Sequence, residues 1–217
     1  MKSKTQPMID NGWNPTLLET IIKIKDLTPD ADSGISSANM DKITSLTLTG
    51  KNIKSLRGIE KLTNLTSLRL FDTQIADLRP LKNLTNLIYL QLIHGQITDL
   101  TPLTNLTNLM ELELYGNQIT NLTPLKDLTD LSFLGLGNNQ IMDLRPLKDL
   151  SNLTFLDLEK NQITDLMPLQ NLTNLTGLWL RNNQITDLMP LQNLTNLRYL
   201  RLGNDQIADD KFSIDKD

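Results

Sequence analysis

Cysteine is absent from this 217-residue chain. Its absence excludes disulfide bonds, thiolate metal sites and every catalytic mechanism that depends on a cysteine nucleophile. It gives no information about the redox compartment in which the chain works.

Strong charge and long apolar segments are also lacking. The formal net charge is −4, and no polybasic stretch indicates nucleic-acid binding. No segment is long and apolar enough to span a bilayer, and residues 1–15 hold no apolar run of signal-peptide length. We therefore expect no membrane insertion, and export only if a signal preceded Met1.

Leucine, in contrast, is abundant and regularly spaced. Residues 156–177, LDLEKNQITDLMPLQNLTNLTG, separate their aliphatic side chains by a step of two, then five, then several steps of three. A step of two is typical of a β-strand, whereas steps of three fit 3₁₀ or polyproline II backbone. Met167 precedes Pro168 and should therefore be extended. We predict one strand followed by a return of short turns and extended pieces.

This pattern recurs every 22 residues, which indicates a repeat protein. The first leucine of each predicted strand lies at Leu46, Leu68, Leu90, Leu112, Leu134, Leu156, Leu178 and Leu200. Burial of the aliphatic residues in one coil contributes roughly 10–20 kcal/mol, whereas ordering the coil costs on the order of 30 kcal/mol. No coil is stable alone, so the strands should stack into one parallel sheet over a shared leucine core.

The motif LxLxxNQIxDLxPLxxLTNL, seen in residues 112–131 and 178–197, resembles the bacterial leucine-rich repeats of the internalins. The resemblance covers roughly residues 43–207 and implies an α/β solenoid, the leucine-rich repeat horseshoe. Eight parallel strands would line its concave face, and 3₁₀ and extended segments would form its convex face. Because one fold hosts many activities, the resemblance is less specific for function.

A small helical cap is expected before the repeats. Asn14 and Pro15 form a good helix start, so we predict a helix over residues 15–25. Its apolar face should cover the first coil, and it consists of Leu17, Leu18, Ile21 and Ile22. A second short helix is expected over residues 36–42, and this prelude resembles the N-terminal cap of the internalins.

The chain is thus predicted to divide into a tail and cap over residues 1–42, a repeat array over 43–207 and a short tail over 208–217. The leucine pattern fails after residue 207, where Asp210 and Ser213 occupy the next aliphatic positions. Phe212 and Ile214 could fold back over the last coil. Otherwise the open end would allow weak self-association of a monomeric chain.

One polar position is predicted to be structural. The residue after the strand turn is Asn117, Asn139, Asn161 and Asn183 in successive coils, and a buried asparagine there can bond the backbone of its neighbours. The first three coils carry Lys51, Thr73 and Gly95 instead, so we expect more irregularity in them.

The outward positions of the strands hold most of the few aromatic residues. The chain has 2 Trp, 3 Tyr and 4 Phe, and all but Trp13 and Phe212 occupy these positions, namely Phe71, Tyr89, Tyr115, Phe133, Phe155, Trp179 and Tyr199. Aromatic residues anchor protein interfaces, so we predict a protein-binding face there. The alternative is that the rings reflect strand propensity and pack on each other.

Charge is sorted along the same face. The middle is acidic and the C-terminal end is basic, through Glu111, Glu113, Asp157 and Glu159 and then Arg181, Arg198 and Arg201. If these charges contact a partner, the partner should carry charges in the opposite order. The alternative is that they are ordinary solvated charges without a role in binding. Arg69 and Ile93 complete the predicted protein-binding residues.

No cofactor, metal or catalytic site is predicted. The lone histidine, His94, lacks an evident nucleophile, and the acidic loop at residues 30–41 does not follow calcium-loop spacing. The two acidic pairs of the strands should lie about 10 Å apart, which could flank a divalent ion or a glycosidic bond. Nothing would seal such a site from water.

We therefore expect a non-enzymatic module that binds a protein. The internalin resemblance implies a host or surface protein as partner and a secreted or cell-surface location, provided that a signal has been removed. A cytoplasmic scaffold similar to the leucine-rich regulators of protein phosphatases is the second hypothesis. A structural spacer without a partner is the third.

Overall fold

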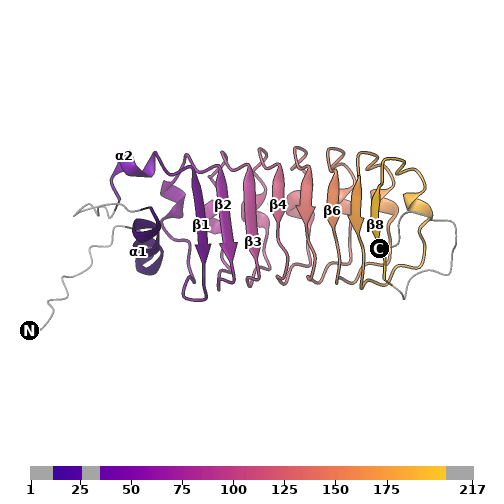
Figure 1. Ribbon diagram of the computed structural model, residues 1–217, viewed down its shortest axis with the longest axis horizontal. Coiled ribbons are helices and arrows are strands. Elements are labelled where there is room, and N and C mark those ends of the chain that lie inside the picture. Colours follow the sequence, from indigo (N-terminus) through magenta and orange to yellow (C-terminus); the bar gives the residue numbers. More distant parts are fainter. Residues whose placement is uncertain (1–11, 26–34, 204–217) are drawn as a thin grey trace, which may run out of the picture.

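The computed structural model describes residues 12–25 and 35–203. Its repeats form one open parallel sheet in which each strand lies beside the next one in sequence (Figure 1). The strands are β1 (Ser45–Thr49), β2 (Ser67–Phe71), β3 (Tyr89–Ile93), β4 (Glu111–Glu113), β5 (Phe133–Gly135), β6 (Phe155–Asp157), β7 (Gly177–Trp179) and β8 (Tyr199–Arg201). The predicted α/β solenoid with eight parallel strands is confirmed.

The 22-residue repeat sets the register of the sheet. Leu46 pairs with Leu68 and Leu90 pairs with Leu112, and every further strand pair keeps this offset. A shift of one residue would turn the leucines of a strand out of the core, so the leucine spacing specifies the pairing.

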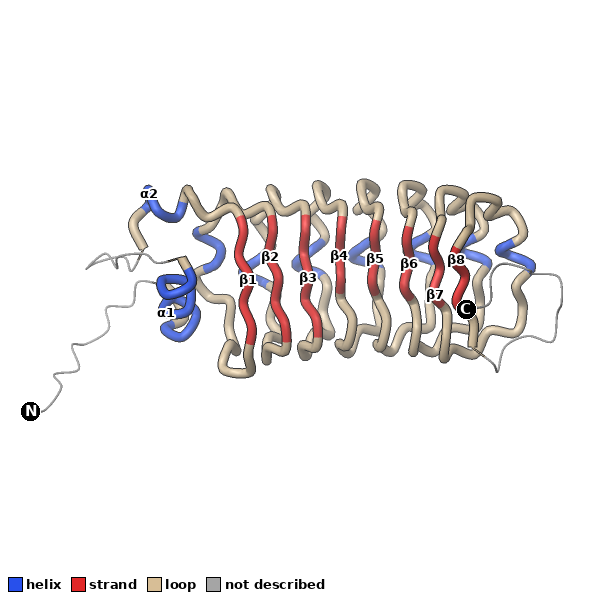
Figure 2. Tube along the Cα trace, in the orientation of Figure 1, coloured by secondary structure: helices blue, strands red, loops and turns tan. Residues whose placement is uncertain are grey.

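The return segments contain 3₁₀ helices, which lie behind the sheet in Figure 2. They are Ile59–Lys61, Arg79–Leu81, Thr101–Leu103, Thr123–Leu125, Arg145–Leu147, Met167–Leu169 and Met189–Leu191. The expectation that Met167 is extended was wrong, because Met167 begins one of these helices. The Leu169 N–H donates to the Leu166 carbonyl at 2.9 Å, and the Met167 N–H donates to Asp165 Oδ1 at 2.8 Å. Together these bonds outweigh the extended preference of a residue before proline.

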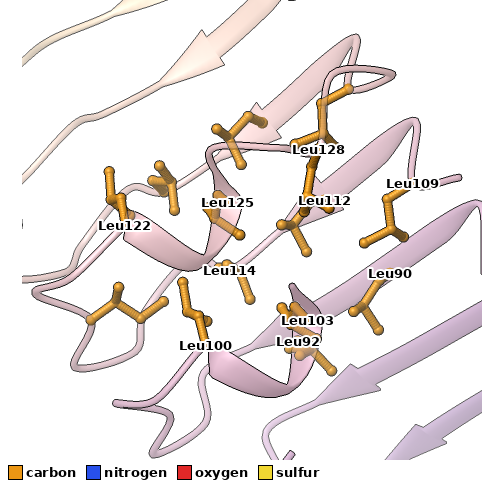
Figure 3. Close-up of a cluster of buried hydrophobic side chains, with 14 of the residues drawn as sticks. Leu90, Leu92, Leu100, Leu103, Leu109, Leu112, Leu114, Leu122, Leu125 and Leu128 are labelled. Atoms are coloured by element: carbon orange, nitrogen blue, oxygen red, sulfur yellow. The ribbon is translucent and has the colours of Figure 1, made fainter. Parts of the chain in front are cut away.

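The core lies between the strands and the 3₁₀ helices. Leucines from both sides interdigitate there, as Figure 3 shows for the coils around β3 and β4. Leu112, Leu125 and Leu134 have no exposed surface. Leu197 and Leu200 in the last described coil are each 9% exposed, so the core is less well covered at that end.

The asparagine ladder is present as predicted. Asn139 Nδ2 donates to the carbonyls of Leu114 and Leu136, each at 3.0 Å, and its Oδ1 accepts from the Ile119 N–H at 3.0 Å. Its Nδ2 also donates to the Gly137 carbonyl at 3.2 Å, so one buried side chain joins four backbone groups from two coils. The first coils differ from the others in strand length, since β1, β2 and β3 have five residues each and the other strands have three. The greater irregularity expected in the first coils stays a prediction.

A second asparagine ladder runs along the outside of the array, and the sequence analysis did not identify it. Each member donates from Nδ2 to a backbone carbonyl 23 residues earlier, as Asn86 does to Thr63 at 2.9 Å and Asn108 does to Thr85 at 2.8 Å. The recurring Leu-Thr-Asn-Leu segment was the available signal. These bonds tie the strand entry of a coil to the preceding coil wherever the asparagine is present, and Asp130 takes its place before β5.

The N-terminal cap consists of α1 (Pro15–Ile24) and α2 (Ser37–Met40), and both helices end before the predicted residues. Asn14 Oδ1 caps α1 by accepting from the Leu17 N–H at 3.0 Å. Leu17 and Ile21 are fully buried and belong to the same core as the repeats. The predicted burial of this helix face is therefore correct. Among the described helices, none combines the length and apolar character that a membrane span requires.

Trp13 joins the N-terminal cap to the first coil, and the sequence analysis found no role for this residue. Its indole packs against Gly58, where any Cβ would overlap the ring, and the Lys61 ammonium lies 5.6 Å from the ring centroid. The Asn14 N–H donates to the Arg57 carbonyl at 2.8 Å. The predicted C-terminal tail, with Phe212 and Ile214, and the acidic loop up to residue 34 lie outside the described residues.

Candidate protein-binding face

The outward residues of β1 to β8 form a continuous surface, which we call the strand face. In β1 and β3 the two leucines are buried while their neighbours are exposed or half-buried. The sheet directs its outward side chains in rows across the strands, because parallel pairing places equivalent residues side by side. The strand face corresponds to the surface predicted to be concave.

An aromatic stack occupies the C-terminal half of the strand face. Phe133 and Phe155 stack with ring centroids 5.0 Å apart and an angle of 2° between their planes. Trp179 meets Phe155 edge-on at 4.8 Å, and the guanidinium of Arg201 lies 4.0 Å from the centroid of a Trp179 ring. These four side chains, which we call the ring stack, come from four consecutive strands.

Glycine at two outward positions shapes the strand face around β5. Gly135 and Gly137 lie between two acidic pairs. Glu111 and Glu113 belong to β4, and Asp157 and Glu159 lie at the end of β6 and just after it. The Glu113 carboxylate leans over Gly135 and occupies the place that a Cβ would take. Asp157 Oδ2 and Tyr115 Cδ2 both lie 2.8 Å from the Cβ position of Gly137. We call this place, bounded by Glu113, Tyr115 and Asp157, the acidic notch.

Burial disfavours the charged forms of both carboxylates in the notch. The pKa of Asp157 is raised from 3.8 to about 6, mainly by desolvation. The hydrogen bond from the Glu159 N–H opposes this rise, the Glu159 charge adds to it, and the Arg201 charge opposes it. Desolvation also raises the pKa of Glu113, with a smaller contribution from the Asp157 charge. Each carboxylate accepts one backbone hydrogen bond, from Tyr115 N to Glu113 Oε1 at 3.1 Å and from Glu159 N to Asp157 Oδ1 at 2.8 Å.

The N-terminal half of the strand face has a smaller cluster. His94 Nδ1 lies 3.0 Å from Asp72 Oδ1, and the His94 ring meets Tyr115 edge-on at 5.5 Å. Both Asp72 and His94 have left-handed backbone, with φ of 52° and 54°. The sequence analysis missed this pair because Asp72 and His94 lie one repeat apart, in consecutive coils.

The structure places all the predicted binding residues on the strand face or at its edge, but it does not bring them into one patch. Phe133, Phe155, Trp179 and Arg201 are in direct contact, and Tyr115 borders the acidic notch. Tyr89 and Tyr199 are 37% and 68% exposed. The others are half-buried or exposed along the array, namely Arg69, Phe71, Ile93, Glu111, Glu113, Glu159 and Arg181; only Asp157 is buried.

The alternative that the rings pack on each other is correct for part of the set. The three rings of the ring stack are half-buried and Arg201 is exposed, and Gly177 gives Phe155 the space to lie flat. Sequence reasoning placed the rings on one face but did not foresee that the glycines of neighbouring strands decide where each side chain leans.

Acidic and histidine side chains were compared with the grouping that a metal site needs. Within residues 12–25 and 35–203, no three His, Asp or Glu side chains come together as a metal site would require. The notch opens directly on the strand face, and a shallow cavity of about 550 Å³ lies elsewhere, along the outer asparagine ladder between Asn64 and Asp130.

The comparisons with known proteins agree with this geometry. The leucine-rich repeat family, in its two-copy description, matches residues 63–105, 107–149, 129–172, 151–189 and 173–213. A comparison with curated proteins gave no significant match.

Solved structures similar to this chain include proteins from two bacterial genera. Internalin C2 of Listeria monocytogenes is 39% identical with a TM-score of 0.70, over 87% of this chain and 93% of that one. An internalin (inlF) of the same species is 34% identical with a TM-score of 0.71, over 88% of this chain and 63% of that one. A leucine-rich repeat protein of Leptospira interrogans is 29% identical with a TM-score of 0.63, over 77% and 51%. The chain therefore belongs to the bacterial leucine-rich repeat proteins of the internalin type.

Proposed function

We propose that this protein is a non-enzymatic module that binds a protein partner through its strand face. The ring stack carries the proposal, because it places Phe133, Phe155 and Trp179 in contact at outward positions of consecutive strands. Rigid aromatic anchors of this kind dominate protein interfaces. By analogy with the internalins, the partner is a host or surface protein, and the module serves in virulence.

Charge along the strand face would orient the partner. The acidic notch adjoins the Phe133 end of the ring stack, and Arg201 forms its other end. A partner with the opposite order of charges would associate faster at low salt, because exposed charges steer encounter and are screened by ions.

The experiment is capture of surface proteins from host cells by the intact chain. The test variant is Phe155→Ala/Trp179→Ala, which removes two anchors from the ring stack. The control variant is Met142→Ala/Met189→Ala, because these side chains are apolar and 62% and 61% exposed but lie outside the strand face. We expect the test variant to lose the captured protein and the control to keep it. Equal capture by both variants would show that the strand face is not the binding surface.

A further inference from the structure

A shallow groove lies along the edge of the sheet at which the strands begin, the upper edge in Figure 1. We call this place, between Asn64 and Asp130, the entry groove. Its volume is about 550 Å³, and Ile88 and Met110 supply its apolar surface. Met110 is 46% exposed and Ile88 is half-buried. Tyr89 follows Ile88 at the start of β3 and is also exposed, so the apolar surface continues onto the strand face.

A ladder of hydroxyl groups is interrupted in the entry groove. In four coils the residue before the strand donates from its hydroxyl to the carbonyl 22 residues earlier, at 3.0–3.1 Å, and these residues are Thr66, Ser132, Thr154 and Thr176. Ile88 and Met110 hold the same position in two neighbouring coils and have no hydroxyl. They forgo a hydrogen bond and expose apolar side chains to water, so the needs of the repeat do not account for them.

The outer asparagine ladder is interrupted at the same place. Asn108 donates from Nδ2 to the Thr85 carbonyl at 2.8 Å. Asp130 holds the next position, and a carboxylate has no N–H to give to the Thr107 carbonyl. Asp130 is the only charged residue that lines the groove, and it forms no ion pair with any described residue. Two apolar departures from the repeat and one acidic departure therefore coincide in the groove.

The chemistry of the entry groove selects its occupant. Ile88 and Met110 offer apolar contact, and Asp130 offers a negative charge without a partner of its own. A complementary segment therefore carries apolar side chains beside a basic one. From Asn64 to Asp130 the groove extends over three coil spacings, about 14 Å. An extended chain of four residues spans about 13 Å, so a short stretch of backbone fits the length of the groove.

We propose that the entry groove binds an extended segment of a protein partner in which apolar side chains adjoin a basic one. The apolar side chains cover Ile88 and Met110, and the basic group pairs with Asp130. This contact goes beyond the proposed function, because it lies on a second surface and does not depend on the ring stack.

The test uses acetyl-Leu-Leu-Lys-amide as the probe and acetyl-Leu-Leu-Gln-amide as its neutral counterpart. Both are titrated at pH 7.5 into the intact chain labelled at its methionine methyl groups, and the Met110 signal is followed by NMR. Met142 and Met189 are internal references, because they are exposed but do not line the groove. A small contact at an open surface should give a millimolar dissociation constant for the lysine peptide. The glutamine peptide should bind about three- to fivefold more weakly, because it lacks the charge that pairs with Asp130.

The variants return the entry groove to the pattern of the other coils, so they should keep the fold. Ile88→Thr/Met110→Thr supplies the hydroxyl at both positions, and Asp130→Asn completes the asparagine ladder. Neither should lower the urea midpoint of unfolding. The first should weaken the lysine peptide by at least about tenfold through loss of apolar contact. The second should abolish the preference for lysine over glutamine.

Met142→Thr is the matched control. It also replaces an exposed methionine with the threonine that neighbouring coils carry at the same position, but outside the groove. It should bind both peptides as the parent chain does.

The proposal is overturned if Met110 does not shift up to the solubility limit of the lysine peptide, if the two peptides bind equally, or if Ile88→Thr/Met110→Thr binds unchanged. A Met110 signal that changes with the concentration of the chain alone would assign the groove to a second copy and also overturn it. Failure of the peptide together with loss of capture by Phe155→Ala/Trp179→Ala would refute the groove and leave the proposed function standing. The opposite pair of results would refute the proposed function alone.

Discussion

At the scale of one residue, the ionised carboxylate of Asp157 lowers the stability of the fold because it is buried in the strand face. The pKa of this carboxyl rises from 3.8 to about 6 on folding, mainly through desolvation. A raised pKa means that the folded state binds the proton more tightly than the unfolded state does. The contribution of Asp157 to stability is therefore fully present below pH 3.8 and is lost as the pH rises through about 6.

Replacing Asp157 with asparagine should stabilise the chain at pH 7 by about 1–2 kcal/mol, because the amide removes the cost of burying a charge. Urea unfolding at pH 4 and pH 7 measures the effect, and the gain should shrink at the lower pH. Glu113, Glu159 and Arg201 also act on this carboxyl or lie near it, so the variant should flatten the pH dependence without abolishing it. A loss of stability at pH 7 would contradict the assignment.

Gly137 is the second residue whose effect can be isolated. A Cβ there would lie 2.8 Å from both Asp157 Oδ2 and Tyr115 Cδ2, which is closer than real side chains approach. Gly137→Ala should therefore destabilise the chain by about 1–3 kcal/mol, measured by urea unfolding. Gly203→Ala is the control, since the nearest atom to its Cβ would be 3.4 Å away, and it should be close to neutral. Equal effects of the two substitutions would show that the notch can relax.

The buried asparagine ladder holds successive coils together at the scale of structural elements. Each of Asn117, Asn139 and Asn161 is 8% exposed and bonds backbone groups of its own coil and the coil before. The side chain thus satisfies groups that the turn would otherwise leave unpaired in the core, where water cannot reach them.

Asn139→Ala should cost about 2–4 kcal/mol, because Ile119 N–H and the carbonyls of Leu114 and Leu136 would lose a partner in the core. Asn108→Ala tests the outer ladder, where the single bond to the Thr85 carbonyl is exposed to water. It should cost less than about 1 kcal/mol. Denaturant midpoints of the two variants give the comparison, and a larger effect at Asn108 would reverse the ranking of the ladders.

The N-terminal cap closes the first coil at the scale of the whole molecule. The contact depends on Gly58, whose φ is 106° and whose missing Cβ leaves space for the Trp13 ring. Gly58→Ala should therefore dislodge the cap, both by backbone strain and by overlap with the indole. Emission from Trp13, recorded in a Trp179→Phe background, should shift to longer wavelength as the ring becomes exposed.

Gly50→Ala is the matched control for this experiment. Gly50 also has a positive φ, of 110°, but its Cβ would meet only the Asn52 side chain. The control should be destabilised by strain while its Trp13 emission stays unchanged. An unshifted spectrum for Gly58→Ala would show that the cap adapts to the added methyl group.

The sequence was sufficient to predict the structural role of those residues whose environment is the same in successive coils. The positions from Leu46 to Leu200, the parallel register and the ladder from Asn117 onward all follow from the spacing, since each coil meets a copy of itself. The first three coils, which lack the asparagine, have longer strands than the others, and the leucine spacing did not predict this difference.

Features that depend on one local combination were not predictable. The lean of Glu113 over Gly135 needs glycine on the next strand, and the burial of Trp13 needs Gly58, more than forty residues away. The ring stack was predicted as a row of rings, but its geometry also depends on Gly177, which lets Phe155 lie flat. Long-range pairs of a large and a small residue leave no periodic signal in a single sequence.

The hydrogen bonds that leave a coil reach only its immediate neighbours, with partners 20 to 25 residues apart in the described ladders. Within residues 12–25 and 35–203, no hydrogen bond of these ladders therefore joins a coil to one beyond its neighbour, so none could carry a mechanical load past a damaged coil. Pulling on the two ends of the protein should part it at whichever interface is weakest, and the thinly covered leucines at residues 197 and 200 mark the C-terminal coil as the place where the first rupture should begin.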